Sequence, residues 1–175
     1  MKRIVSLILL TALLLPAAAL AAPVDFASLS DEQLQAVIDG ARQELANRQV
    51  ANTPYLAKGT VAGLFVGIKS VVRSEDYEGK PAFTLSYDLR NDSQQNINPM
   101  ITLSVEVSQA GAANDVTAIM RPGQGITLPF YDELKPGALM SPDIDYRLNG
   151  DGPITVTITP LVPGAEPMVA ELQLP

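Results

Sequence analysis

Three residue types are absent from this chain, and their absence limits which catalytic and metal-binding sites it can form. The 175 residues include no histidine, no cysteine and no tryptophan. Histidine-based triads, cysteine nucleophiles, disulfides, and thiolate zinc or iron–sulfur sites are therefore excluded. The best carboxylate pair is Asp76 and Glu78, which lie two positions apart and could act as acid and base. Because Gly79-Lys80-Pro81 follows them, we interpret the pair as a solvated hairpin tip.

A second group of acidic residues resembles a calcium-binding loop in composition. Asp143 and Asp145 are followed by the segment Asn149-Gly150-Asp151-Gly152. The spacing of an EF-hand fails, because Ile154 stands where the bidentate acid should be. Asn-Gly is instead a strong signal for a tight turn between two strands. We expect no metal site here, and a calcium-stabilised spacer remains an alternative.

Two further motifs contain residue types used in nucleophilic or phosphate chemistry. Lys69 stands beside Ser70, but a Ser/Lys pair needs a deprotonated lysine. Adjacent residues of a strand point to opposite faces, so we expect the two side chains to be apart and Lys69 to face solvent. The segment Arg121-Pro122-Gly123-Gln124-Gly125 lacks the strand and helix that flank a phosphate loop. We therefore predict no catalytic residue, no cofactor and no metal ligand.

The first residues are typical of a secretory signal peptide. Lys2 and Arg3 precede an apolar run from Ile4 to Leu15, and Ala19 and Ala21 form a small-x-small cleavage site. We predict that residues 1–21 are removed. Since no lipid-anchoring cysteine follows, we expect a secreted chain, extracellular or associated with the cell envelope, without stable membrane insertion.

The charge balance narrows the choice of partners. The chain has 12 Lys and Arg against 19 Asp and Glu, and its formal net charge is −7. Nucleic-acid binding needs clustered basic residues to neutralise phosphates, so this partner class is excluded. A protein or a cell-envelope component remains possible, and the sequence leaves the oligomeric state open.

One amphipathic helix is predicted after the signal peptide, running to about Arg48. Ser30 is a good N-cap, and Gln33 completes a capping box three residues later. Apolar residues then recur at helical spacing. They are Leu34, Val37, Ile38, Ala41 and Leu45. This stripe could dock on the rest of the domain, which is the favoured interpretation, or pair with a helix of a second copy or a partner.

Beyond a linker at Gln49–Gly59, the apolar period changes from helical to two. Alternation of this kind is typical of half-buried strands in an antiparallel sheet. The predicted strands centre on Leu64–Ile68, Phe83–Leu89, Ile101–Val107, Ile126–Phe130, Ile144–Leu148, Ile154–Ile158 and Met168–Leu172. We predict a mainly β protein, an immunoglobulin-like antiparallel β-sandwich of about seven strands preceded by one amphipathic α-helix. Residues 22–58 would hold the helix and linker, and residues 59–175 the sandwich.

Four short segments also carry a family resemblance, covering about residues 62–160. They are Ser74–Ala82 (with Asp-Tyr-Glu-Gly-Lys-Pro-Ala), Tyr87–Ser93, Gln109-Ala110-Gly111 and Leu134–Gly137. Together they resemble a family of secreted Gram-positive immunoglobulin-like domains of unknown function, distantly similar to the MPT63-type mycobacterial antigen sandwich. The resemblance implies a secreted sandwich and no active-site residues. Relatives often carry a lipobox cysteine, which is absent here.

The sequence thus favours a secreted, non-enzymatic immunoglobulin-like module that binds a protein or a cell-envelope component. Recognition would use a sheet face, an edge strand or the helix. One alternative is an extracellular hydrolase that depends on carboxylates. It would need two acids in one cleft, roughly 5–10 Å apart, one with a raised pKa.

Overall fold

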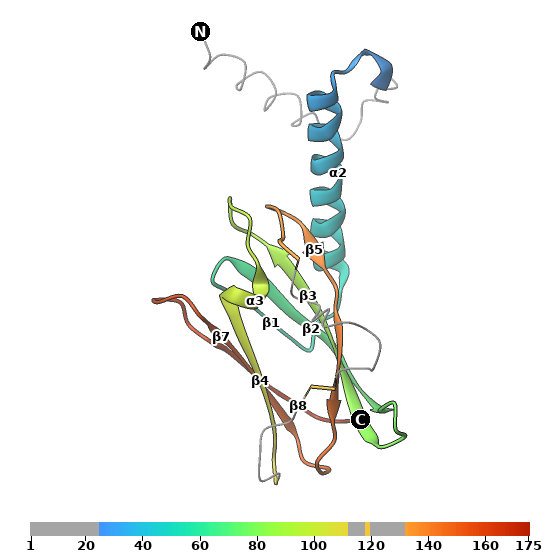
Figure 1. Cartoon of the computed structure of the whole chain (residues 1–175), viewed down its shortest axis with the longest axis vertical. Helices are drawn as coiled ribbons and strands as arrows, with labels where there is room; N and C mark the ends of the chain where they lie inside the picture. Colours follow the sequence, from blue (N-terminus) through green and yellow to red (C-terminus); the bar gives the residue numbers. More distant parts are fainter. Residues whose placement is uncertain (1–24, 112–117, 120–131) are drawn as a thin grey trace. The chain divides into compact units, whose positions relative to one another are not determined.

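The computed structural model (Figure 1) describes residues 25–111, 118–119 and 132–175. The predicted signal peptide, the predicted strand at Ile126–Phe130 and the segment Arg121–Gly125 lie outside the described residues. The chain forms two compact units, Met1–Ile38 and Asp39–Pro175. In the described part of the chain, no helix is long and apolar enough to cross a membrane.

A short 3-10 turn, η1 (Phe26–Ser28), precedes the helix α2 (Asp31–Asn52). The predicted capping box is present at its start. The backbone N–H of Ser30 donates to Gln33 Oε1 at 2.9 Å, and the N–H of Gln33 donates to Ser30 Oγ at 3.3 Å. Both bonds satisfy amides that have no partner inside the helix. The helix ends four residues beyond the predicted end at Arg48.

The larger sheet is built around two long antiparallel strands. β3 pairs with β2 along one side and with the short β5 and β6 along the other, and β1 pairs with the outer side of β2. Both turn residues between β1 and β2, Ala62 and Gly63, have positive φ, as a two-residue hairpin turn requires. The strands are β1 (Ala57–Val61), β2 (Leu64–Glu75), β3 (Pro81–Asn91), β5 (Leu139–Met140) and β6 (Asp143–Arg147).

The smaller sheet has three antiparallel strands in the order β4-β7-β8. They are β4 (Leu103–Gln109), β7 (Ile154–Pro160) and β8 (Met168–Leu172). A helical turn, α3 (Pro99–Thr102), comes just before β4, because Pro99 suits the first position of a helix and the Asn98 side chain caps Met100 N–H.

The core lies between the two sheets, where alternate residues of the strands point inward. The fully buried side chains include Leu64, Val66, Ile68, Phe83, Leu85, Tyr87, Leu89, Ile154, Val156 and Ile158. The rings of Phe83 and Tyr146 stack at 5.4 Å between centroids. The predicted class is therefore confirmed: the protein is a mainly β sandwich of two antiparallel sheets preceded by one helix.

Two local predictions differ from the structure. Ile101 was assigned to a strand, but it lies in α3 and is 73% exposed. The capped turn at Asn98-Pro99 overrides the alternating pattern there. The predicted linker also contains regular structure, because α2 continues to Asn52 and β1 begins at Ala57.

Candidate functional site

Four polar side chains are buried in the described part of the sandwich, and they provide the starting point for locating a site. They are Asp76, Asp88, Asn91 and Gln109. A buried polar group is costly unless it is hydrogen-bonded, so each must have partners that explain its burial. Asp76, Asn91 and Gln109 bond mainly to backbone groups of turns, whereas Asp88 bonds only to other side chains.

Asp76 fastens the β2–β3 hairpin. Its Oδ1 accepts the backbone N–H groups of Glu78 and Lys80, both at 2.8 Å. The bond from the Lys80 N–H is the main reason that the pKa of Asp76 is below its ordinary value. Glu78 forms an ion pair with the Lys80 ammonium. Asp76 and Glu78, the predicted acid/base candidates, therefore lie at the hairpin tip that the sequence favoured, but Asp76 is buried there and not solvated as predicted.

Asn91 joins two loops at the end of β3. Its Nδ2 donates to the carbonyls of Gln95 at 2.6 Å and Leu134 at 2.7 Å, and its Oδ1 accepts the N–H and hydroxyl of Ser93. Its backbone also exchanges bonds with the Lys135-Pro136-Gly137 turn and the residue after it. The Asn-Asp-Ser and Lys-Pro-Gly segments of the family resemblance thus form one structural unit.

Gln109 holds the turn between β6 and β7. Its Nε2 donates to the carbonyls of Gly150 at 2.8 Å and Gly152 at 3.2 Å, and its Oε1 accepts the N–H of Asn149. The acids near this turn are used elsewhere. Asp145 accepts the Thr84 hydroxyl at 2.7 Å.

The calcium-loop residues accordingly lie in a different arrangement. Asp151 forms an ion pair with Arg73 at 3.1 Å, and Asp143 is exposed at the start of β6. Within residues 25–111, 118–119 and 132–175, no cluster of three Asp or Glu side chains could hold a metal ion.

Asp88 is the buried centre of a side-chain network, the Asp88 cluster, formed by Tyr55, Lys69, Asp88 and Ser141. Its Oδ1 accepts the Ser141 hydroxyl at 2.6 Å and the Lys69 ammonium at 2.9 Å. Its Oδ2 accepts the Tyr55 hydroxyl at 2.7 Å. One carboxylate therefore ties the segment after α2 to β2, β3 and the β5–β6 corner.

The strand β2 is shaped to make this network possible. The β2–β3 pairing shifts between Ile68 and Ser70, which leaves Lys69 as the extra residue of a bulge. Two positions earlier, Gly67 has no side chain, and a Cβ there would lie 2.4 Å from the Tyr55 ring. The bulge directs Lys69 to Asp88, and the glycine leaves room for the Tyr55 ring against β2.

The prediction that Lys69 faces solvent is therefore wrong. Its side chain is 26% exposed and is paired with Asp88. The local alternation placed it correctly on the outer face of the sheet, but it could not show that Tyr55 covers that face. The candidate partner Ser70 lies on the other side of the bulge, opposite Ser86 of β3.

The electrostatics of the Asp88 cluster favour a stabilising role over a catalytic one. Burial raises the pKa of Asp88, but bonds from Ser141, Lys69 and Tyr55 outweigh it and hold the pKa below its ordinary value. Burial and the neighbouring carboxylate raise the pKa of Tyr55 to about 12. A general acid needs the opposite shift, a carboxyl with a raised pKa that substrate can reach.

The helix contacts the sandwich through its polar face. From Asp39 onward, Ala46 is its buried residue, Asn47 accepts a bond from Arg90 at 3.0 Å, and Gln49 donates to Ser141 at 3.3 Å. Two residues of the predicted apolar stripe in this part of the helix, Ala41 and Leu45, are exposed, Leu45 to 66%. From Asp39 onward, the favoured interpretation, that the apolar stripe docks on the sandwich, is therefore wrong.

A hollow lies beside this contact, and we call it the polar pocket. Its volume is about 260 Å³. It is lined by Gln43, Asn47, Arg90, Asn91, Asp92, Ser93, Gln94, Pro136 and Gly137. The pocket is therefore built from the helix α2, the loop after β3 and the Lys-Pro-Gly turn. The start of the loop and the turn belong to segments on which the family resemblance rests, but the sequence did not predict that they form a site with the helix.

Arg90 is the best-fixed charged group of the pocket. Its guanidinium lies over the Phe65 ring at 5.5 Å and binds both oxygens of Asp92, at 2.6 and 3.2 Å. With the bond to Asn47, three neighbours hold it in place. Gln43 packs on the turn, because a Cβ at Gly137 would meet its side chain at 2.7 Å. The walls of the pocket are thus preorganised.

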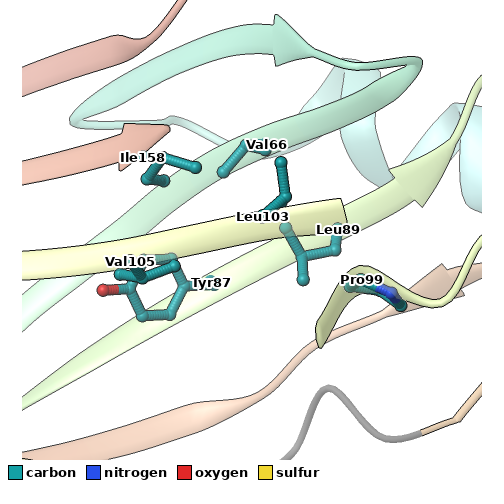
Figure 2. Close-up of a pocket in the computed structure, with 7 residues that line it drawn as sticks. All are labelled: Val66, Tyr87, Leu89, Pro99, Leu103, Val105 and Ile158. Atoms are coloured by element: carbon teal, nitrogen blue, oxygen red, sulfur yellow. The ribbon is translucent and has the colours of Figure 1, made fainter. Parts of the chain in front are cut away.

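A second hollow, shown in Figure 2, lies between the sheets and is apolar. Side chains from both sheets and from α3 line it: Val66, Tyr87, Leu89, Pro99, Leu103, Val105 and Ile158. Its interior volume is about 20 Å³, enough for roughly one water molecule. We interpret it as a packing void in the core.

Comparison with known proteins identifies a family for most of the sandwich. The sequence profile described as a domain of unknown function, DUF5067, matches residues 58–160. No curated protein matches the chain.

Three solved structures to which the chain is similar come from Gram-positive bacteria. A lipoprotein candidate from Staphylococcus aureus is 15% identical, with 70% of this chain and 97% of that chain covered and a TM-score of 0.46. A lipoprotein candidate from Bacillus subtilis is 10% identical, with 65% and 38% covered and a TM-score of 0.48. An uncharacterised β-sandwich protein from Clostridium difficile is 12% identical, with 69% and 93% covered and a TM-score of 0.42.

Proposed function

The chain belongs to the DUF5067 family of domains of unknown function, and we propose that it is an exported, non-enzymatic module that binds a component of the cell envelope through the polar pocket. The observation that carries this proposal is the convergence of α2, the loop after β3 and the Lys-Pro-Gly turn on one preorganised hollow. Binding sites are commonly concave, largely preformed and lined by a few fixed polar groups.

The state of the carboxylates supports binding rather than hydrolysis. Asp76 and Asp88 both have a pKa below the ordinary value, and both are held by donors inside the fold. A glycosidase or a similar hydrolase needs one acid with a raised pKa close to a second acid in an accessible cleft. Asp88 is fully buried, so substrate cannot reach it.

The location in the envelope rests on the N-terminal sequence pattern. A positive start, an apolar run and a small-x-small site before Ala22 are typical of export. The immunoglobulin-like character of the sandwich fits such a role, because domains of this architecture are common on cell surfaces and in secreted proteins.

The proposal can be tested by cosedimentation of the exported chain with washed envelope fractions of the producing bacterium. We expect the chain to sediment with the envelope and the double variant Gln43→Ala/Gln94→Ala to lose most of this binding. Gln173→Ala is a matched control, because it removes the same kind of exposed side chain outside the pocket.

Two results would contradict the proposal. If the double variant sediments as well as the unchanged chain, the pocket is not the binding site. If the chain turns over an envelope substrate and loses that activity when one carboxylate is replaced, the non-enzymatic assignment is wrong and the hydrolase alternative takes its place.

A further inference from the structure

We propose that the polar pocket recognises an uncharged sugar residue of an envelope glycan. This inference rests on the proposed function and names the class of ligand. It is argued from the size of the pocket, the charge of its lining, the hydrogen-bonding groups that it leaves open and the shape of its walls.

The size of the pocket limits the ligand to a small group. Its volume of about 260 Å³ lies just below the range of roughly 300–1,000 Å³ that is usual for small-molecule sites. A single sugar ring fits such a space, whereas several residues of a folded partner do not. We therefore expect one ring to enter the pocket while the rest of the glycan lies outside.

The charges of the lining cancel each other. Among the described residues that line it, the ionised side chains are Arg90 and Asp92, and they are bound to each other through two hydrogen bonds. An anionic ligand would have to displace Asp92, and a cationic ligand would have to displace Arg90. The chain as a whole carries a net charge of −7, which also repels anionic polymers. A neutral ligand avoids both costs.

The groups that remain open are matched donors and acceptors. The amides of Gln43 and Gln94 form no hydrogen bond with the described residues, and each offers both an N–H₂ and a carbonyl oxygen. Asn47 uses its oxygen for Arg90 and keeps its N–H₂ for a ligand. Sugar hydroxyls can donate and accept at once, so a ring with neighbouring hydroxyls suits this mixture.

The shape of the pocket favours a sugar over a peptide. Extended peptides are usually bound along a sheet edge or in a groove with pockets for apolar side chains. The hollow here is compact, and Pro136 is the lone bulky apolar residue among those lining it. Among the described residues, no aromatic ring lines the pocket to stack on a sugar, so hydrogen bonds must supply the affinity. We therefore expect weak binding, with a Kd in the millimolar range.

The inference can be tested by NMR titration of the isotope-labelled exported chain with three related sugars and one peptide. The sugars are N-acetylglucosamine, which is neutral, glucosamine, which is cationic, and glucuronate, which is anionic. Acetyl-trialanine-amide is the uncharged peptide. We expect saturable shifts for N-acetylglucosamine at the backbone amides of Gln43, Asn47, Arg90–Gln94 and Gly137, and weaker binding of both charged sugars.

Variants locate the binding site. Gln43→Ala and Gln94→Ala should each raise the Kd for N-acetylglucosamine about threefold to tenfold, as expected for one hydrogen bond. Gln173→Ala should leave the Kd unchanged. Neither pocket glutamine bonds to the described fold, so both variants should keep the spectrum of the folded chain.

The outcomes separate this inference from the proposed function. If no sugar shifts the pocket amides but the envelope fraction still binds through Gln43 and Gln94, the ligand is not a neutral sugar and the binding function stands. If acetyl-trialanine-amide binds there instead, the ligand class is a peptide. If the envelope fraction does not bind at all, the proposed function fails too.

Discussion

Asp88 and Arg90 lie two positions apart on the same face of β3, yet they have opposite surroundings. Asp88 is fully buried, and three side chains satisfy its carboxylate. Arg90 stands at the edge of a hollow with unused hydrogen-bonding groups around it. The difference arises because Tyr55 covers Asp88, while beside Arg90 the helix α2 contributes the Asn47 side chain, which bonds to Arg90, and the Gln43 side chain, which lies against the Gly137 turn.

The Asp88 cluster and the polar pocket differ in whether their hydrogen-bonding groups are already used within the protein. In the Asp88 cluster, every strong bond of the carboxylate is made within the protein, so it contributes stability and specificity of docking. In the polar pocket, Arg90 and Asp92 hold each other in place while neighbouring amides remain available. We infer that the Asp88 cluster fixes the segment after α2 on the sheet. This attachment places α2 beside Arg90, where the polar pocket is open to a ligand.

The largest effect should come from removing the centre of the cluster. Asp88→Ala leaves the Lys69 ammonium, the Tyr55 hydroxyl and the Ser141 hydroxyl without their acceptor. We expect the free energy of unfolding to fall by about 3–5 kcal/mol, as for a broken buried ion pair. Urea unfolding followed by circular dichroism measures the change.

Asp143→Ala is the matched control, since Asp143 is an exposed aspartate at the start of β6. We expect it to change the free energy of unfolding by less than about 0.5 kcal/mol. If both variants change the free energy of unfolding equally, the Asp88 cluster stabilises the fold no more than an exposed aspartate does.

The next effect concerns the wall of the polar pocket. Gly137→Ala places a Cβ 2.7 Å from Gln43 at a residue with φ of +74°. The left-handed backbone costs about 1–2 kcal/mol for a residue with a side chain, and moving the exposed, flexible Gln43 side chain away from the turn adds about 0.5 kcal/mol. Gly79→Ala has the same φ of +74° with open space around it, so it should show the backbone cost alone.

Thermal and urea unfolding of the two glycine variants provide the comparison. If Gly79→Ala is as destabilising as Gly137→Ala, the contact between Gln43 and the turn does not hold in solution. The helix would then not form the wall of the pocket.

A smaller effect should appear when the Tyr55 hydroxyl is removed. Tyr55→Phe deletes one donor to an ionised carboxylate, and we expect a loss of about 1.5 kcal/mol at neutral pH. The folded pKa of Tyr55 is raised to about 12, above the unfolded value of about 10. The contribution of the hydroxyl is therefore complete below pH 10 and disappears as the pH rises through about 12.

Unfolding of the unchanged chain and of Tyr55→Phe at several pH values tests this. The difference between them should be constant from neutral pH to the unfolded pKa and should shrink above it. The chain has five tyrosines and no tryptophan, so the tyrosinate absorbance of the unchanged chain minus that of Tyr55→Phe follows the ionisation of Tyr55. A difference that does not depend on pH would mean that the hydroxyl is not bonded to Asp88.

Low pH should also reduce the stability of the fold, because it protonates the carboxylates of Asp88 and Asp76. The folded pKa values of Asp88 and Asp76 are lowered, so their contribution is complete above the unfolded pKa of about 4 and is lost as the pH falls below it. The Asp88→Asn variant should therefore be less sensitive to acid than the unchanged chain. Equal losses of stability in acid would contradict this assignment.

The smallest effect on stability should come from the open region. Gln94→Ala removes a side chain that makes no hydrogen bond with the described residues, so the free energy of unfolding should change by less than about 0.5 kcal/mol. The same variant should weaken ligand binding. A large loss of stability would show that Gln94 is structural and that the pocket is not an open site.

The sequence by itself determined the local structure of this protein. Alternation placed the buried residues of β3 and β7 correctly, such as Phe83 and Ile158. Ser30 and Gln33 predicted the start of α2, and the turn signals predicted where the β2–β3 hairpin bends. These features depend on residues that are neighbours in the chain, so composition and spacing are enough to reveal them.

What covers the outer face of the larger sheet depends on tertiary contacts and could not be predicted from the sequence. Alternation marks Lys69 and Asp88 as outward-facing, which normally means exposed. They are covered because Tyr55, 33 residues from Asp88, and Ser141, 53 residues from it, fold over the carboxylate. Contacts between distant segments also determine which face of α2 packs on the sandwich and where the polar pocket forms beside Arg90. Contacts between distant segments leave no periodic signal, because they depend on how the layers come together.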